Sequence, residues 1–118
     1  MNKVKYIVPL ALVILTNGIY FAEMNNLTMY LRFFEDGRVI SANVPGKYSQ
    51  INRWFNTTYR ENIGFYTMEN GTISFTTNAN EGSVEYSGRI GRTSIRLDIH
   101  SNINGHKLRN IRFRFARF

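Results

Sequence analysis

Two dipeptides, Asp36-Gly37 and Asn70-Gly71, constrain the fold most, because each separates two runs in which apolar and polar residues alternate. Such dipeptides favour a two-residue type I′ hairpin turn, which needs a positive φ angle at both central residues. The turn also fixes which residues face one another across the hairpin. At Asp36-Gly37 it pairs Phe33 with Ile40, Leu31 with Ala42 and Met29 with Val44 on the inner face, and Tyr30 with Asn43 on a polar outer face. At Asn70-Gly71 it pairs Glu69 with Thr72, Met68 with Ile73 and Tyr66 with Phe75.

Two more hairpins are predicted around Gly91 and Gly105. A turn at Ile90-Gly91 opposes Glu85 to Arg96, whereas a turn at Gly91-Arg92 opposes it to Asp98. The first is favoured because opposite charges attract across strands. A three-residue loop, Ile103-Asn104-Gly105, opposes Leu97 to Ile111 and Ile95 to Phe113.

Eight strands follow from this alternation, near residues 18–23, 28–35, 38–44, 63–68, 72–78, 83–90, 93–100 and 107–116. One short helix is expected near 48–56, where Ile51, Trp54 and Phe55 recur at helical spacing. Sequential hairpins close on themselves because closure removes unpaired strand edges. The sequence therefore predicts an all-β, eight-stranded antiparallel up-and-down barrel with one short helix between strands 3 and 4.

The N-terminus has the layout of a secretory signal peptide, with Lys3 and Lys5 before an uncharged stretch over 6–15 and small or polar residues up to Gly18. We therefore expect a signal peptide over 1–18 and a single barrel domain over 19–118, exported to the periplasm or the medium. Two alternatives stay open. Residues 6–22 could anchor the protein in a membrane, or the N-terminus could be part of the fold of a cytoplasmic protein.

The composition argues against several classes of chemistry. The 118 residues contain no Cys, only two His and eight carboxylates, against fifteen Lys and Arg that give a net charge of +7. Disulfides and thiolate sites are excluded, and no cofactor is expected. His100 and His106 flank the last loop, but two His without a third ligand are weak evidence for zinc. We expect neither an enzyme nor a metal protein.

The C-terminal run 109–118 alternates Arg with Phe, as in a stacking surface for single-stranded nucleic acid. In a strand, however, Phe113 and Phe115 point to one side while Arg112 and Arg114 point to the other. The rings and the guanidinium groups then cannot share one binding face, so nucleic acid is not expected as a partner. The pattern instead predicts an outward basic stripe for anionic lipid, glycan or acidic protein, made of Arg32, Arg89, Arg96, Arg112 and Arg114.

Several segments together resemble the small bacterial lipocalin-like domains of the calycin type, a largely uncharacterised family. They are Gly18-Ile19-Tyr20, the run from Tyr30 to Gly37, the run from Asn70 to Phe75, and the run from Val84 to Ile90. The resemblance implies transport or sequestration of small apolar molecules, or a purely protein-binding role.

The sequence thus predicts a non-catalytic, monomeric binding protein that holds a small apolar or amphipathic ligand in a barrel cup. Four residues are candidates to line the cup because each combines apolar area with one polar atom: Tyr20, Trp54, Tyr66 and Tyr86. The alternative is a surface-acting interaction or structural protein that binds an anionic macromolecule or membrane through the basic stripe.

Overall fold

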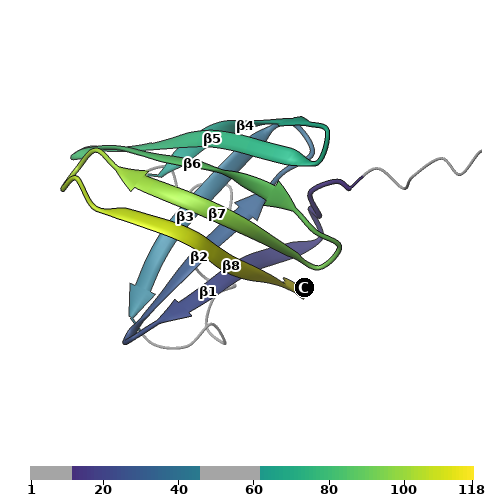
Figure 1. Cartoon of the computed structure of the whole chain (residues 1–118), viewed down its shortest axis with the longest axis horizontal. Coiled ribbons are helices and arrows are strands. Elements are labelled where there is room, and N and C mark those ends of the chain that lie inside the picture. The colour runs from purple at the N-terminus through teal and green to yellow at the C-terminus, as the bar shows by residue number, and fades with distance from the viewer. Residues whose placement is uncertain (1–11, 46–61) are drawn as a thin grey trace, which may run out of the picture.

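The computed structural model describes residues 12–45 and 62–118, and these form one closed antiparallel barrel (Figure 1). Each strand pairs with the next along the chain, and β8 pairs with β1 to close the ring. The expected fold is confirmed. The expected helix at 48–56 lies outside the described residues. The strands are β1 (Gly18–Met24), β2 (Leu27–Phe33), β3 (Arg38–Pro45), β4 (Ile63–Glu69), β5 (Thr72–Ala79), β6 (Gly82–Ile90), β7 (Ser94–Ser101) and β8 (Lys107–Arg117).

The Asn70-Gly71 turn forms as predicted. Asn70 and Gly71 have φ angles of 54° and 80°, which a type I′ turn requires. Tyr66 lies opposite Phe75 and Met68 opposite Ile73, in the expected register.

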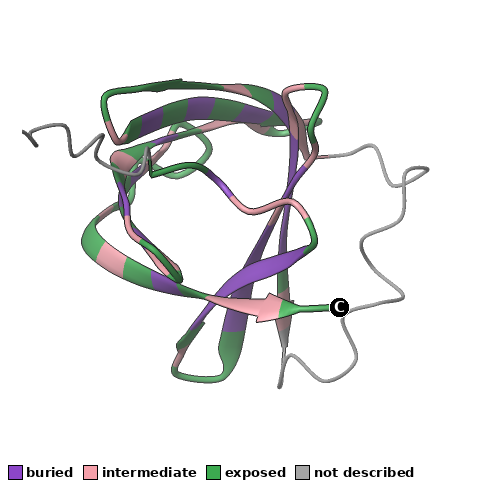
Figure 2. Ribbon diagram, turned by 90° about the vertical axis from the view of Figure 1, so that its right-hand side faces the viewer, coloured by how far each residue is buried: buried purple, intermediate pink, exposed green. Residues whose placement is uncertain are grey.

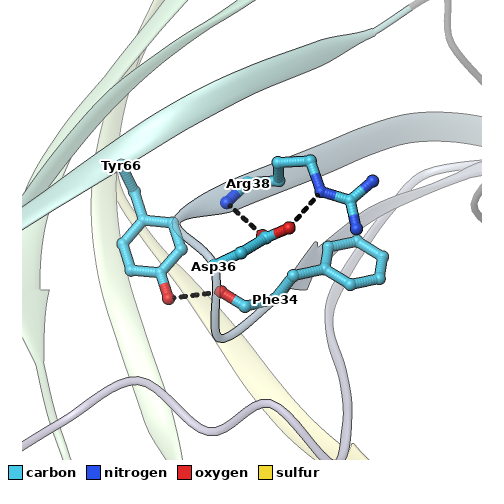
Figure 3. A network of polar contacts seen from close by, with 4 residues as sticks. All are labelled: Phe34, Asp36, Arg38 and Tyr66. Carbon is cyan, nitrogen blue, oxygen red and sulfur yellow. Dashed lines mark hydrogen bonds and ion pairs between the residues drawn. The ribbon is translucent and has the colours of Figure 1, made fainter.

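The register predicted at Asp36-Gly37 is wrong by one residue, because Phe33 lies opposite Val39 and not Ile40. The loop has three residues: the Phe34 N–H donates to the Arg38 carbonyl at 2.9 Å, and Gly37 alone has a positive φ, 95°. The Asp36 carboxylate accepts the Arg38 N–H at 3.1 Å and fixes this longer loop (Figure 3).

A one-residue shift moves every side chain of a strand to the other face. Val39 therefore belongs to the barrel interior, whereas Ile40 and Ala42, which were expected there, belong to a second buried cluster. This second cluster also contains Ile19, Phe21 and Tyr30. Both faces of β1, β2 and β3 thus carry buried apolar side chains, and the expected polar outer face at Tyr30 is wrong.

The expected register of β6 with β7 is also wrong, since Glu85 lies opposite His100 and neither Arg96 nor Asp98. The loop closes on Gly91 and Ser94, where the Gly91 N–H donates to the Ser94 carbonyl at 2.8 Å. This register differs from each of the two alternatives by an even number of residues, so the strand faces stay as predicted. Tyr86, Ile90, Ile95, Leu97 and Ile99 are all buried.

The last hairpin has the predicted pairs, with Leu97 opposite Ile111 and Ile95 opposite Phe113. Its loop is nevertheless one residue longer than expected, closing on Ser101 and His106. A β-bulge in β8 compensates: Asn110 has a φ of 55°, and its N–H donates to Asp98 Oδ1 at 2.8 Å.

Side chains fill much of the barrel interior, and Figure 2 views the ring of strands from one end. Phe33 lies at the centre of an aromatic cluster and contacts the rings of Tyr20, Tyr66 and Phe75 edge-on, with centroids 5.1–5.6 Å apart. Ile14, 7% exposed, joins this core from the segment that precedes β1.

Candidate functional site

Two of the predicted cup residues, Tyr20 and Tyr66, contribute to the packed core. The Tyr20 hydroxyl accepts the Leu15 N–H at 3.0 Å, and the Tyr66 hydroxyl donates to the Phe34 carbonyl at 2.7 Å (Figure 3). Burial raises the pKa of both phenols above the usual value of 10.0. The hydroxyl groups of Tyr20 and Tyr66 are thus both hydrogen-bonded to the backbone.

Tyr86 belongs to the same core cluster and is stacked on Phe75, with ring centroids 4.5 Å apart. Burial raises the pKa of its phenol, and hydrogen bonds with Ser41 and Thr77 partly offset this effect. Trp54 lies outside the described residues. The structure thus links Tyr20, Tyr66 and Tyr86 through Phe33 and Phe75 and leaves Trp54 undescribed.

A cavity of about 110 Å³ adjoins Tyr86. Its lining includes the hydroxyls of Ser41 and Thr77, which are hydrogen-bonded at 3.3 Å, as well as Asn43, Asn62 and Val84. Pockets for small organic ligands usually measure about 300–1,000 Å³. This polar cavity is therefore too small for the apolar ligand that the sequence predicts, unless the barrel expands.

Three of the five predicted arginines lie directly opposite one another on adjacent strands. Arg89 of β6 pairs with Arg96 of β7, and Arg96 pairs with Arg112 of β8. All three are exposed, and among the described residues no ion pair involves them. We call Arg89, Arg96 and Arg112 the arginine row. Neighbouring strands lie about 4.8 Å apart, so the row spans about 10 Å at the backbone.

The other two arginines of the predicted stripe contact aromatic rings. The Arg114 guanidinium lies 4.9 Å from the Phe21 ring centre, on β8 next to the arginine row. The Arg32 guanidinium lies 4.6 Å from the rings of both Phe34 and Phe118. Burial, followed by the nearby Arg38, lowers the pKa of Arg32. Arg32 is therefore separate from the arginine row.

The alternation predicted for the end of β8 is confirmed, since Phe113 is fully buried while Arg112 and Arg114 are exposed. The bulge at Asn110 then lets the first half of β8 expose cations as well: Lys107 and Arg109. These two exposed cations were not predicted from the sequence. The signal for them is the change of parity at Asn110, since Lys107 and Arg109 occupy odd positions before it and Arg112 and Arg114 occupy even positions after it.

An open groove of about 700 Å³, also missed, lies beside the arginine row on strands β4 to β8. Two cross-strand rows run across it. One consists of Phe65, Thr76, Glu85, His100 and Lys107, and the other of Thr67, Ser74, Ser87 and Asp98. The second of these rows is the immediate neighbour of the row that contains Thr72, Arg89, Arg96 and Arg112.

Hydrogen bonds orient both carboxylates of the groove. Glu85 Oε2 accepts from Asn102 Nδ2 at 2.9 Å, and Asp98 Oδ1 accepts the Asn110 N–H. The Thr67 and Ser74 hydroxyls are 3.2 Å apart. The groove is thus lined by fixed polar atoms, with the exposed ring of Phe65 at the β4 side.

Among the described residues the one ion pair joins Arg38 to Asp36 at 2.8 Å, in the β2–β3 turn (Figure 3). The hydrogen bond from the Arg38 N–H, together with the guanidinium, lowers the pKa of Asp36. No three acidic or His side chains within 12–45 and 62–118 gather as a metal site would require. The same residues include no helix long and apolar enough to cross a membrane.

Comparisons of this chain with family models, with curated proteins and with solved structures find no match. The eight-stranded closed antiparallel barrel is compatible with the lipocalin-like fold that the sequence suggested. Functional inference therefore depends on the chemistry of the surfaces described above.

Proposed function

We propose that this protein is a non-catalytic binding protein that holds an anionic polymer on the arginine row. The observation that carries the proposal is the direct cross-strand placement of Arg89, Arg96 and Arg112. Like charges opposite one another destabilise a sheet. An anion lying along the row would neutralise this repulsion. A guanidinium group can also donate two parallel hydrogen bonds to two oxygens of one phosphate, sulfate or carboxylate group.

A matched pair of variants tests this function. Arg96→Gln and Arg117→Gln each remove one exposed positive charge from β7 or β8, but only Arg96 is in the arginine row. With inorganic polyphosphate as the probe, Arg96→Gln should weaken binding about tenfold and lower its salt dependence, whereas Arg117→Gln should change binding less than about twofold. Equal effects of the two variants would mean that the net positive charge attracts the polyanion non-specifically and that the arginine row is not a binding site.

Retention of a small ligand inside the barrel is the second candidate. The closed barrel supports it, and the candidate requires that the cavity beside Ser41, Thr77 and Tyr86 expands to admit the ligand. Native mass spectrometry of protein purified from its own host tests this candidate: a bound small molecule supports the cup, and a consistently empty protein argues against it.

Export from the cell is also part of our proposal, on the pattern of residues 1–18. Cleavage after Gly18 would remove Ile14 from the core cluster, so the mature barrel would be less covered at that end. Mass spectrometry of the native N-terminus tests export, with a chain that begins at Ile19 as the expected result. An intact N-terminus argues for the membrane anchor if the protein is found with membranes and for the cytoplasmic alternative if it is not.

A further inference from the structure

The groove and the arginine row form one continuous surface. The row of Thr67, Ser74, Ser87 and Asp98 lies two residues along the strands from the arginine row, which corresponds to about 6.8 Å. A polymer bound to the arginine row would therefore meet the groove with its next units where it continues along the strand direction.

The chemistry of the groove differs from that of the arginine row. At its centre are two carboxylates, Glu85 and Asp98, each held by a hydrogen bond through one oxygen. Ordered carboxylates accept hydrogen bonds well from hydroxyl groups and repel phosphates. Ser and Thr hydroxyls surround them and can both donate and accept.

The two side walls of the groove complete this pattern. Phe65, 68% exposed, offers an aromatic face on β4 on which the C–H groups of a sugar ring can pack. Lys107 and Arg109 on β8 form the opposite wall and are positively charged. The groove thus combines acceptors for hydroxyls, one apolar face and a cationic border.

We infer that the anionic polymer is an acidic polysaccharide, with hydroxyl-rich sugar rings in the groove and acidic substituents on the arginine row and the β8 wall. The inference rests on the proposed function and specifies its ligand. A nucleic acid fits less well, because a phosphate on every unit would bring negative charge next to Glu85 and Asp98.

The test compares three polyanions: a dextran sulfate of low substitution, which has sugar rings with most hydroxyls free, polyphosphate, which has no sugar rings, and single-stranded oligothymidylate. Phe65→Ala should weaken dextran sulfate binding about tenfold, as expected for loss of one aromatic packing contact, and change polyphosphate binding less than about twofold. Phe118→Ala is the matched control, since Phe118 is an exposed ring outside the groove. It should change neither affinity.

Glu85→Gln tests the inference through the direction in which the affinity for each polyanion changes. If Glu85 accepts sugar hydroxyls, the variant binds dextran sulfate more weakly and polyphosphate equally or more tightly. If the carboxylate only repels anions, the variant binds both more tightly, and the inference is wrong. The inference is equally overturned if oligothymidylate binds as tightly as dextran sulfate and loses as much affinity in Phe65→Ala, because nucleic acid is then the better ligand.

These outcomes separate the inference from the proposed function. If Arg96→Gln weakens the binding of all three polyanions while Phe65→Ala weakens the binding of none, the arginine row binds anions and only the polysaccharide assignment fails. If Arg96→Gln affects no polyanion, the proposed function fails first.

Discussion

Replacement of Phe33 by Leu tests the origin of the stability of the barrel. Phe33 is 0% exposed and makes edge-on contacts with three aromatic rings. Phe113 is also 0% exposed and belongs to the same core cluster, but it makes no such ring contact with the described residues. The same substitution at the two positions therefore separates aromatic pairing from burial.

The magnitudes follow from these contacts. A Phe→Leu change keeps most of the buried apolar volume, so at Phe113 it should lower the free energy of unfolding by less than about 1.5 kcal/mol. An aromatic pair adds about 0.5–1.5 kcal/mol beyond burial. Three pairs that share one ring are not fully additive, so Phe33→Leu should cost about 2–3 kcal/mol more than Phe113→Leu.

Urea denaturation of the two variants, followed by circular dichroism, measures this difference. The midpoint should fall further for Phe33→Leu, while the slope of the free energy against urea stays unchanged in both variants. Equal losses at the two positions would refute the reasoning, because burial alone would then account for the core.

Three further results are expected. The Asp36 carboxylate should contribute a stabilisation that is present above pH 3.8 and is lost as the pH falls through the lowered pKa of Asp36. Asp36→Asn should remove this contribution, and measurement of the melting temperature against pH detects the change. The same fall of the melting temperature in acid for both proteins would contradict this. Burial raises the phenol pKa values of Tyr20 and Tyr86, so stability should fall as the pH rises above 10.0; ionisation of all seven tyrosines near pH 10 in the folded protein, followed by phenolate absorbance, would contradict this. In Gly88→Ala the new Cβ would lie 1.8 Å from a carbonyl oxygen of β7, so this variant should lose more than about 1 kcal/mol in urea titration while Ser87→Ala changes little; equal, small losses would argue against the close strand contact.

The turns show which parts of the fold the sequence could predict. Asn70-Gly71 was predictable because both residues adopt positive φ. Asp36-Gly37 was not, because the Asp36 side chain fixes a three-residue loop that also ends in Gly. The alternation could not reveal the error, since Val39 and Ile40 are both apolar and both faces of β3 are buried.

The candidate site was predictable to a smaller extent. The alternation of side chains along a strand was enough to predict that Arg112 and Arg114 face outward, because large aromatic residues stand next to them on β8. The cross-strand alignment of Arg89, Arg96 and Arg112 depends on the β6–β7 register, for which the favoured turn was wrong. The groove combines positions from five strands, so no single segment carries its signal.

The bulge at Asn110 keeps the cations of β8 on one face of the strand although their spacing is irregular. Arg109 and Arg112 are an odd number of residues apart, so in a regular strand they would point to opposite sides. The bulge takes up Asn110 as one extra residue and lets both side chains face outward. Deletion of Asn110 would therefore leave a regular strand in which Lys107, Arg109, Arg112 and Arg114 alternate with apolar residues and still face outward, and it would remove the hydrogen bond to Asp98 Oδ1. Relatives of this protein that lack the bulge should therefore also lack one residue between Arg109 and Arg112.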